Sequence, residues 1–362
     1  MPHPTRTFTR FRPRPLLALL LMAALLLTAA AGCGKNDTVE STGDPTLSAT
    51  DTTTTAAPTA TAKPTATPRP TATPTPSPTP ALDLASINLF TGLPRENPDD
   101  AQPRPVGVMI NNTKKALPQI GISQADVIIE LPVEGGVTRL LTLFADPSTI
   151  PELGSIRSVR HDYVELVASL DVLVTHVGGS YLADDLIAAE KIQTINYMNT
   201  SIPFWRDADW RSNRGYEHSV KTTGERIMKY LNSRDSLRKT VKDPQTMFNF
   251  QPTDQLVPAV GEPAETVNAP FSRYTKAAFN YDADTKLYSK FQFDQPHLDQ
   301  ATGEAVRFTN VLLLPTSIPV ITSSGHIDAD LSGGSGLYLS GGFAQPIRWK
   351  KGSMYERLRF YT

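Results

Sequence analysis

The fold is decided by an apolar run that reads PVGVMINN from Pro105 to Asn112. Its residues are apolar at successive positions rather than at alternate ones, which is typical of a strand covered on both faces. Three further runs of this kind follow, at 126–131, 137–145 and 172–177. Because such strands are characteristic of α/β folds, we expect a mixed sheet with covering helices.

Helical patterns lie between and after these strands. Apolar residues recur at helical spacing from Tyr163 to Leu170, and Ser158 is a candidate N-cap for that helix. A second helix is expected after Ser180, and a third from Thr222 onwards. The sequence therefore predicts an α/β domain over residues 83–240.

A smaller, mostly β domain is expected over residues 241–362. Short apolar or alternating runs are separated by Gly and Asp turns, which is typical of consecutive short strands. The runs are 276–281, 287–293, 310–314, a hairpin over 336–350, and 355–361. They predict a small meander or barrel-like sheet.

Residues 1–32 have the pattern of a lipoprotein signal peptide. Four arginines precede an apolar run from Leu16 to Leu27, which is shorter than the roughly 20 residues that span a membrane. The run is followed by Ala30-Ala31-Gly32-Cys33, which resembles a bacterial lipobox. Cys33 is the only cysteine in the chain, so we expect it to be lipidated; a plain secretory signal is the alternative.

Residues 33–82 are expected to be a disordered linker that begins at the lipidated cysteine. The stretch from Thr52 to Pro80 is almost wholly Thr, Ala and Pro. Such a stretch has no large apolar side chain to bury, so folding cannot offset its conformational entropy. The protein is therefore expected outside the cytoplasm, held at the cell membrane by its lipid anchor.

Composition excludes several classes of function. The chain has 35 Lys and Arg against 36 Asp and Glu, a net charge of −1, so we expect no nucleic-acid partner. The single cysteine excludes a disulfide framework. The sequence has neither metal-ligand spacing nor a dinucleotide fingerprint, and it lacks a Gly-x-Ser-x-Gly elbow. We therefore expect no metal and no cofactor, and assign no catalytic residue.

Five segments carry a family resemblance when they are taken in order. They are 104–112, 121–126, 130–139, 156–160 and 176–180. Together they resemble the DUF3048 family of bacterial lipoproteins, over residues 86–362. The resemblance implies an N-terminal and a C-terminal domain of that family, but no activity, because the family's function is unknown. The family usually continues with a further strand, so we expect that the C-terminal domain is truncated or lacks that strand.

Polar side chains gather at the expected strand ends and in the turns that follow them. Arginines bind carboxylates and phosphates bidentately, and glycine turns at helix starts favour anions. If the strands are parallel at these ends, ligands collect beyond their C-terminal edge. The candidate binding residues are Asn111, Asn112, Glu130, Glu134, Arg139, Arg157, Arg160, His176, Ser180, Arg214 and His218.

These residues also have a structural interpretation. Arg139, Arg157 and Arg160 would then pair with Glu130 and Glu134 to hold loops in place. Pairing below the surface would favour this interpretation, whereas convergence on an open surface with unpaired groups would favour a site.

We favour a ligand- or partner-binding, or scaffold, lipoprotein of the cell envelope. It would present the Arg/Glu/His cluster to an envelope polymer or a protein partner. The alternative is an envelope hydrolase or transferase that acts on an anionic or glycan substrate. In that case Glu134 is the acid or base, His176 its partner, and Arg157 and Arg160 the substrate clamp. Binding is favoured because the sequence has no nucleophile or metal signature.

Overall fold

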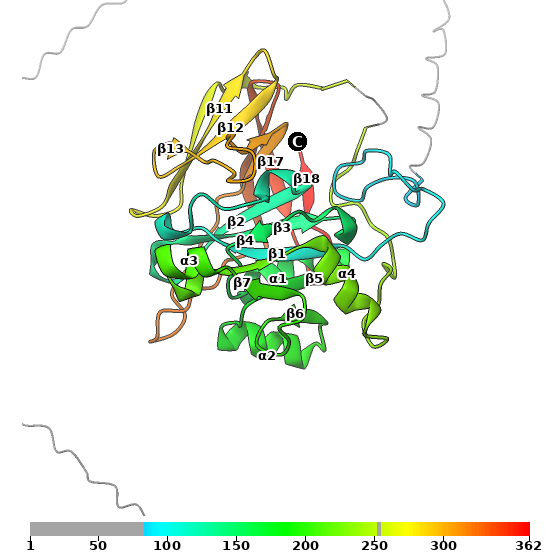
Figure 1. Ribbon diagram of the computed structural model, residues 1–362. Helices are drawn as coiled ribbons and strands as arrows, with labels where there is room; N and C mark the ends of the chain where they lie inside the picture. The colour runs from blue at the N-terminus through cyan, green and yellow to red at the C-terminus, as the bar shows by residue number, and fades with distance from the viewer. Residues whose placement is uncertain (1–82, 252–254) are drawn as a thin grey trace, which may run out of the picture. The chain divides into compact units, whose positions relative to one another are not determined.

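A computed structural model describes residues 83–251 and 255–362 (Figure 1). The expected signal peptide, the lipidation site Cys33 and the linker lie outside the described residues. Within 83–251 and 255–362, no helix has the length and apolar character needed to cross a bilayer.

A five-stranded mixed sheet forms the centre of the N-terminal part. Its strand order is β2-β3-β1-β5-β6, with β1, β5 and β6 parallel and β3 antiparallel to both of its neighbours. The strands are β1 (Val106–Asn111), β2 (Val127–Pro132), β3 (Thr138–Phe144), β5 (Leu173–His176) and β6 (Thr194–Asn196). The predicted strands are present, and β1 and β5 end at the same edge of the sheet.

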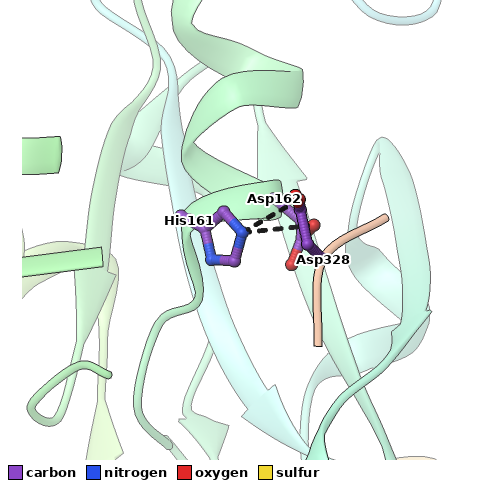
Figure 2. Close-up of side chains that lie close together, drawn as sticks. All are labelled: His161, Asp162 and Asp328. Atoms are coloured by element: carbon purple, nitrogen blue, oxygen red, sulfur yellow. Dashed lines mark hydrogen bonds and ion pairs between the residues drawn. The ribbon is translucent and has the colours of Figure 1, made fainter. Parts of the chain in front are cut away.

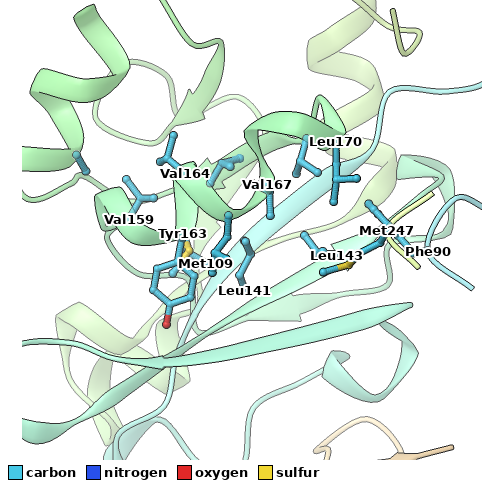
Figure 3. Close-up of a cluster of buried hydrophobic side chains, with 14 of the residues drawn as sticks. Phe90, Met109, Leu141, Leu143, Val159, Tyr163, Val164, Val167, Leu170 and Met247 are labelled. Atoms are coloured by element: carbon cyan, nitrogen blue, oxygen red, sulfur yellow. The ribbon is translucent and has the colours of Figure 1, made fainter. Parts of the chain in front are cut away.

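Helix α1 (His161–Val167) covers one face of this sheet. Its Tyr163 and Val167 pack with Met109 of β1 and with Leu141 and Leu143 of β3 (Figure 3). Every residue of β1 and β3 is buried, as expected for strands covered on both sides. The sheet is therefore the rigid base on which the polar edge is built.

Helix α4 (Gly224–Asn232) covers the opposite face. Its Ile227 and Leu231 belong to a second buried cluster with Ile110 of β1 and Leu140 of β3. The strands therefore send successive side chains into two separate cores. The other helical segments are α2 (Tyr181–Ala189), α3 (Ala208–Asn213), η1 (Lys114–Ala116), η2 (Ile122–Gln124), η3 (Glu134–Gly136), η4 (Pro147–Thr149), η5 (Ala168–Leu170) and η6 (Tyr216–His218).

Side-chain caps begin α2 and α4, whereas the cap predicted for α1 is absent. The Ser180 hydroxyl accepts a hydrogen bond from the Ala183 N–H at the start of α2. Thr223 caps α4 in the same way. The prediction of Ser158 as N-cap of α1 is wrong, because the N-cap is Arg160 and no side chain caps that helix.

A loop from Ser155 to Arg160 runs along the polar edge of the sheet. The Arg157 N–H donates to the Met109 carbonyl of β1. The Val159 N–H donates to the Gly178 carbonyl beyond β5. In the chain, the loop comes directly after β4 (Leu153–Gly154). β4 belongs to a small sheet of order β4-β8-β7, with β7 (Phe204–Arg206) and β8 (Val220–Thr222). The loop is therefore held at the C-terminal ends of β1 and β5.

The C-terminal part is mostly β, as predicted, but its strands form two sheets rather than one small sheet. In Figure 1 its yellow strands β11 and β12 lie at the opposite end of the folded unit from α2. The strand expected over 355–361 begins only at Arg359. The first sheet holds β10 (Thr266–Pro270), β11 (Lys276–Asp282), β12 (Leu287–Gln292), β13 (Gln295–Pro296) and β14 (Arg307–Phe308). The second holds β9 (Glu262–Pro263), β15 (Asn310–Leu313), β16 (Gly333–Ser340), β17 (Phe343–Lys350) and β18 (Arg359–Tyr361).

Candidate anion-binding site

Three arginines meet at the polar edge of the central sheet. Arg139 is the second residue of β3 and pairs in register with Asn111 at the end of β1. Its guanidinium donates a hydrogen bond to the Ser158 carbonyl in the loop beyond. Arg157 and Arg160 flank that carbonyl in sequence, and the positive charges of both act on Arg139. The fold therefore gathers side chains from β3 and from the loop before α1.

Arg139 is the most unusual of the three. It is 8% exposed, and among the described residues no carboxylate lies within 4 Å of its guanidinium. Burial, with a further contribution from the charge of Arg160, lowers its pKa to about 9. The Tyr163 hydroxyl, 2.7 Å from the Arg139 carbonyl, holds the backbone in place. A buried cation without a counter-charge is unfavourable, so an anion nearby would stabilise it.

Arg160 is paired, as the structural interpretation predicts. Its Nε lies 2.8 Å from both carboxylate oxygens of Glu134, and one terminal nitrogen lies 2.7 Å from Oε2. Burial opposes ionisation of Glu134, but the ion pair outweighs it and lowers the pKa of this carboxyl. The pair neutralises Arg160, whereas Glu134 acts on the charge of Arg139 only from beyond ion-pair distance.

Arg157 is the most accessible of the three. Its side chain is 30% exposed and lies 3.2 Å from Glu217, which is itself 57% exposed. An ion pair at this level of exposure contributes little to stability. The Asn111 amide donates to Nδ1 of His218 at 2.7 Å, and Nε2 of His218 lies 3.2 Å from Glu217. Burial lowers the pKa of His218, so this histidine is neutral and adds no cation.

His176 and Ser180 lie beside the cluster rather than in it. Nδ1 of His176 donates to the Gly178 carbonyl at 2.8 Å, and burial lowers the pKa of the ring. Its Nε2 is buried and has no hydrogen-bond partner in the described chain. Ser180 is occupied as the cap of α2.

Glu130 and Asn112 do not join the arginines. The Glu130 carboxylate lies 3.0 Å from Lys290 of β12, a pairing that the sequence analysis did not anticipate. It also accepts from Asn112 at 2.9 Å and from the Thr138 hydroxyl at 2.6 Å. These groups therefore belong to a buried contact between the N-terminal and C-terminal parts.

Gln119 and His297 extend this contact. The Gln119 amide donates to Oδ1 of Asn112 at 3.1 Å and accepts from Nε2 of His297 at 2.7 Å. Nδ1 of His297 lies 3.1 Å from Nζ of Lys290. Burial and the neighbouring lysine hold the pKa of His297 well below its usual range. The result is a fully buried ring of polar groups with a structural role.

Arg214 also serves the structure between the two parts. It donates to the carbonyls of Ala116 at 2.9 Å and Pro118 at 2.8 Å, and to Oε1 of Gln300 at 2.8 Å. Its guanidinium stacks 3.8 Å from the Trp210 ring centre. Arg214 therefore fixes the loop before Gln119 and is separate from the three clustered arginines.

One group of metal-ligating residue types has no spacing in the sequence that would reveal it. His161 and Asp162 at the start of α1 face Asp328, with Nε2 of His161 3.2 Å from Asp328 and 3.7 Å from Asp162 (Figure 2). Asp162 accepts the Ala329 N–H at 2.8 Å. Metal-bound histidines usually donate their second ring N–H, whereas Nδ1 of His161 is buried and has no partner in the part of the chain that is described. We interpret these residues as a structural contact that joins α1 to the chain before β16.

The fold and the polar edge together define a class of two-part proteins. The mixed α/β part carries the polar cluster, and buried polar groups join the mostly β part to the α/β part. Residues 90–237 match the N-terminal domain of the DUF3048 proteins of unknown function. Residues 267–362 match the C-terminal domain. The chain belongs to the DUF3048 family.

Two comparisons give the particular relative. The chain is 31% identical to "Putative lipoprotein YerB" of Bacillus subtilis (strain 168) over 257 residues, which is 68% of this chain and 73% of that protein. It also resembles the crystal structure of the YerB protein from Bacillus subtilis, with a TM-score of 0.64 and 27% identity. That match covers 76% of this chain and 90% of the YerB chain. The expected family and fold class are therefore confirmed, and the relative is named as a lipoprotein.

Proposed function

We propose that this chain is a lipid-anchored binding protein of the cell envelope that holds an anionic group at Arg139, Arg157 and Arg160. The observation that carries the proposal is the buried Arg139, whose guanidinium has no carboxylate within 4 Å among the described residues, while the charge of Glu134 acts on it from farther away. Glu134 and Glu217 supply two negative charges against three guanidinium groups. The cluster therefore has one positive charge in excess and suits a carboxylate or phosphate of an envelope polymer or of a partner protein.

The three arginines have different parts in this proposal. Arg157 is half-buried, the most accessible of the three, and loosely paired, so it makes the first contact with the ligand. Arg139 lies deeper and provides the uncompensated charge. Arg160 is held by Glu134 and keeps the loop in shape around the other two. Most of the binding free energy is expected to come from the arginines whose charges are least balanced by carboxylates before the ligand binds.

The alternative of a hydrolase or transferase receives less support. Both oxygens of Glu134 are engaged by Arg160, and this ion pair lowers the pKa of the carboxyl. A general acid at neutral pH needs a pKa raised toward 7. His176 bonds to the Gly178 carbonyl and not to Glu134. The proposed catalytic pair is therefore not in contact.

The second part of the proposal is a lipid anchor at the N-terminal side of the folded part. Cys33, in its lipobox-like sequence, would carry the lipid, and the Thr/Pro-rich linker would let the folded part reach away from the membrane. The relative's name as a lipoprotein supports this arrangement.

Binding can be tested by calorimetric titration of the full chain in detergent with teichoic-type poly(glycerol phosphate), and with a peptidoglycan fragment that carries free carboxylates. We expect at least one of the two to bind, and Arg157→Gln to weaken binding about tenfold, the effect of losing a charge-assisted contact of about 1.4 kcal/mol. Arg226→Gln, an exposed arginine on α4 outside the cluster, is the matched control and should bind like the wild type. Equal affinities for the two variants would contradict the assignment of the site.

A further inference from the structure

A surface pocket of about 360 Å³ lies between the segment 114–118 and the hairpin that joins β12 to β13. Most of its wall is apolar, and the wall includes Lys114, Leu117, Pro118, Phe293, Pro296 and Leu298. Small-ligand sites combine apolar walls with a few polar groups, and their volumes begin at about 300 Å³. This pocket fits that description and is distinct from the arginine cluster.

Phe293 occupies a backbone conformation that bulky residues rarely adopt. Phe293 has a φ of 53° and Asp294 a φ of 62°, and these two residues form the tight turn between β12 and β13. Asn-Gly is the favoured pair in such turns, because a Cβ is disfavoured at positive φ. The turn itself therefore does not require a phenylalanine, whereas the pocket obtains an aromatic wall from it.

The polar side chains that line the pocket are Lys114, Gln292 and Gln295, and none of them is a carboxylate. Nζ of Lys114 lies 5.4 Å from the centre of the Phe293 ring, and no carboxylate within the described ranges pairs with it. Gln292 also lines the pocket. Its Oε1 accepts from Lys290, and its Nε2 has no partner among the described residues. Lys114 is thus the one cation among the described residues that line the pocket, and its charge is complementary to an anion.

Arg214 keeps one wall of the pocket in place. It donates to the carbonyls of Ala116 and Pro118 and to Gln300 of the C-terminal part. A wall fixed before binding loses less entropy when the ligand enters.

We propose that this pocket binds a small carboxylate with an apolar body. The apolar part packs against Phe293 and Leu117, and the carboxylate lies against Lys114. Two sources carry this chemistry, namely a free branched-chain acid and the carboxyl terminus of a peptide with an apolar last residue.

The test is saturation-transfer NMR on the full chain in detergent with three probes, each at about 10 mM, because ligands of this size bind weakly. The probes are N-acetyl-L-leucine, 4-methylpentanoate and N-acetyl-L-leucinamide, which lacks the carboxylate. We expect the carboxylates to bind and the amide to bind at least about fivefold more weakly, which corresponds to about 1 kcal/mol. Binding of both acids assigns the shared chemistry, and binding of N-acetyl-L-leucine alone assigns the peptide terminus.

Variants separate this pocket from the arginine cluster. Phe293→Asn keeps a residue that tolerates the turn and should abolish the signal, and Lys114→Gln should weaken it. Asp294→Gly alters the same turn without removing the ring, and Arg157→Gln alters only the arginine cluster, so both should bind like the wild type. Equal binding of the amide, wild-type binding by Phe293→Asn, loss of binding in Arg157→Gln, or no signal from either acid would overturn the proposal.

Discussion

Two buried cations near the polar edge of the sheet have opposite surroundings. Lys290 is 3% exposed and lies 3.0 Å from the carboxylate of Glu130. Arg139 is about equally buried, but its guanidinium meets a backbone carbonyl and two other arginines. The first arrangement satisfies a charge within the fold. In the second, Glu134 acts on the charge only from beyond 4 Å, so we assign a structural role to Lys290 and propose a binding role for Arg139.

Removing Lys290 should be strongly destabilising. Lys290→Met leaves the Glu130 carboxylate buried without its cation, and loss of one partner of a buried pair costs about 3–5 kcal/mol. Lys290→Met combined with Glu130→Gln removes both charges and should recover most of that loss. Urea unfolding of the two variants measures the difference. A loss below about 1 kcal/mol in the single variant would show that the pair is not a stabilising contact.

His297 should make the protein sensitive to acid. Because its pKa is lowered on folding, the unfolded chain binds a proton at a pH where the folded chain does not. Stability from this group is present above the unfolded pKa of about 6.5 and falls as the pH drops from there toward the folded pKa. The slope is at most about 1.4 kcal/mol per pH unit. His297→Gln should give a shallower slope in unfolding measurements between pH 7 and 5; an unchanged slope would show that this histidine does not titrate differently on folding.

Single residues were the hardest part to predict from the sequence. The sequence named Arg139, Arg157 and Arg160 as candidates but did not settle whether they converge; the structure brings them together because the loop after β4 crosses the edge where β1 ends and β3 begins. The partners of Glu130 and Gln119 were not predicted, because Lys290 and His297 are more than a hundred residues away in the chain and follow no local spacing. Arg214 looked like a binding residue but holds backbone carbonyls.

At the scale of elements, local patterns predicted strands better than caps. The short apolar runs predicted the central strands, of which β1 and β3 are buried throughout while β2 is half-buried. Ser158 failed as an N-cap because its neighbours Arg157 and Val159 form hydrogen bonds with the chain at the ends of β1 and β5. That extended loop delays the start of α1 to His161. A tertiary contact thus outweighed a reasonable local signal.

The two serines provide a matched test of this conclusion. Ser180→Ala removes the hydroxyl that accepts the Ala183 N–H and should cost about 1 kcal/mol of stability. Ser158→Ala removes no cap and should change stability by less than about 0.5 kcal/mol. Thermal unfolding compares the two variants directly. Equal losses would mean that the capping assignment is wrong.

At the scale of the whole molecule, buried polar groups join the two parts of the fold. Asp299 accepts the N–H groups of Gly121 and Ser123 at 2.8 Å each, and the Glu130–Lys290 pair lies in the same contact. The sequence predicted an N-terminal α/β part and a mostly β part, and it did not predict how they meet. Periodicity describes each part separately, whereas the contact depends on residues brought together only by the complete fold.

The anchor is a separate prediction at this scale. Cys33→Ala should release the protein into the medium or leave it with an uncleaved signal peptide, because no thiol remains to accept the lipid. Cell fractionation with an antibody to the folded part, together with the mass of the product, measures this. Retention at the membrane after normal signal cleavage would contradict lipidation at Cys33.

We propose that Arg139 binds an anionic ligand and contributes little to the stability of the fold. Arg139→Met tests it most directly when unfolding and anion titration are measured on the same preparation. We predict that the melting temperature changes by no more than a few degrees, because loss of the hydrogen bond to the Ser158 carbonyl, about 1 kcal/mol, opposes the gain from removing a buried charge, while binding of the anionic polymer is lost. A drop in melting temperature of about 8 °C or more, with anion binding retained, would contradict the account.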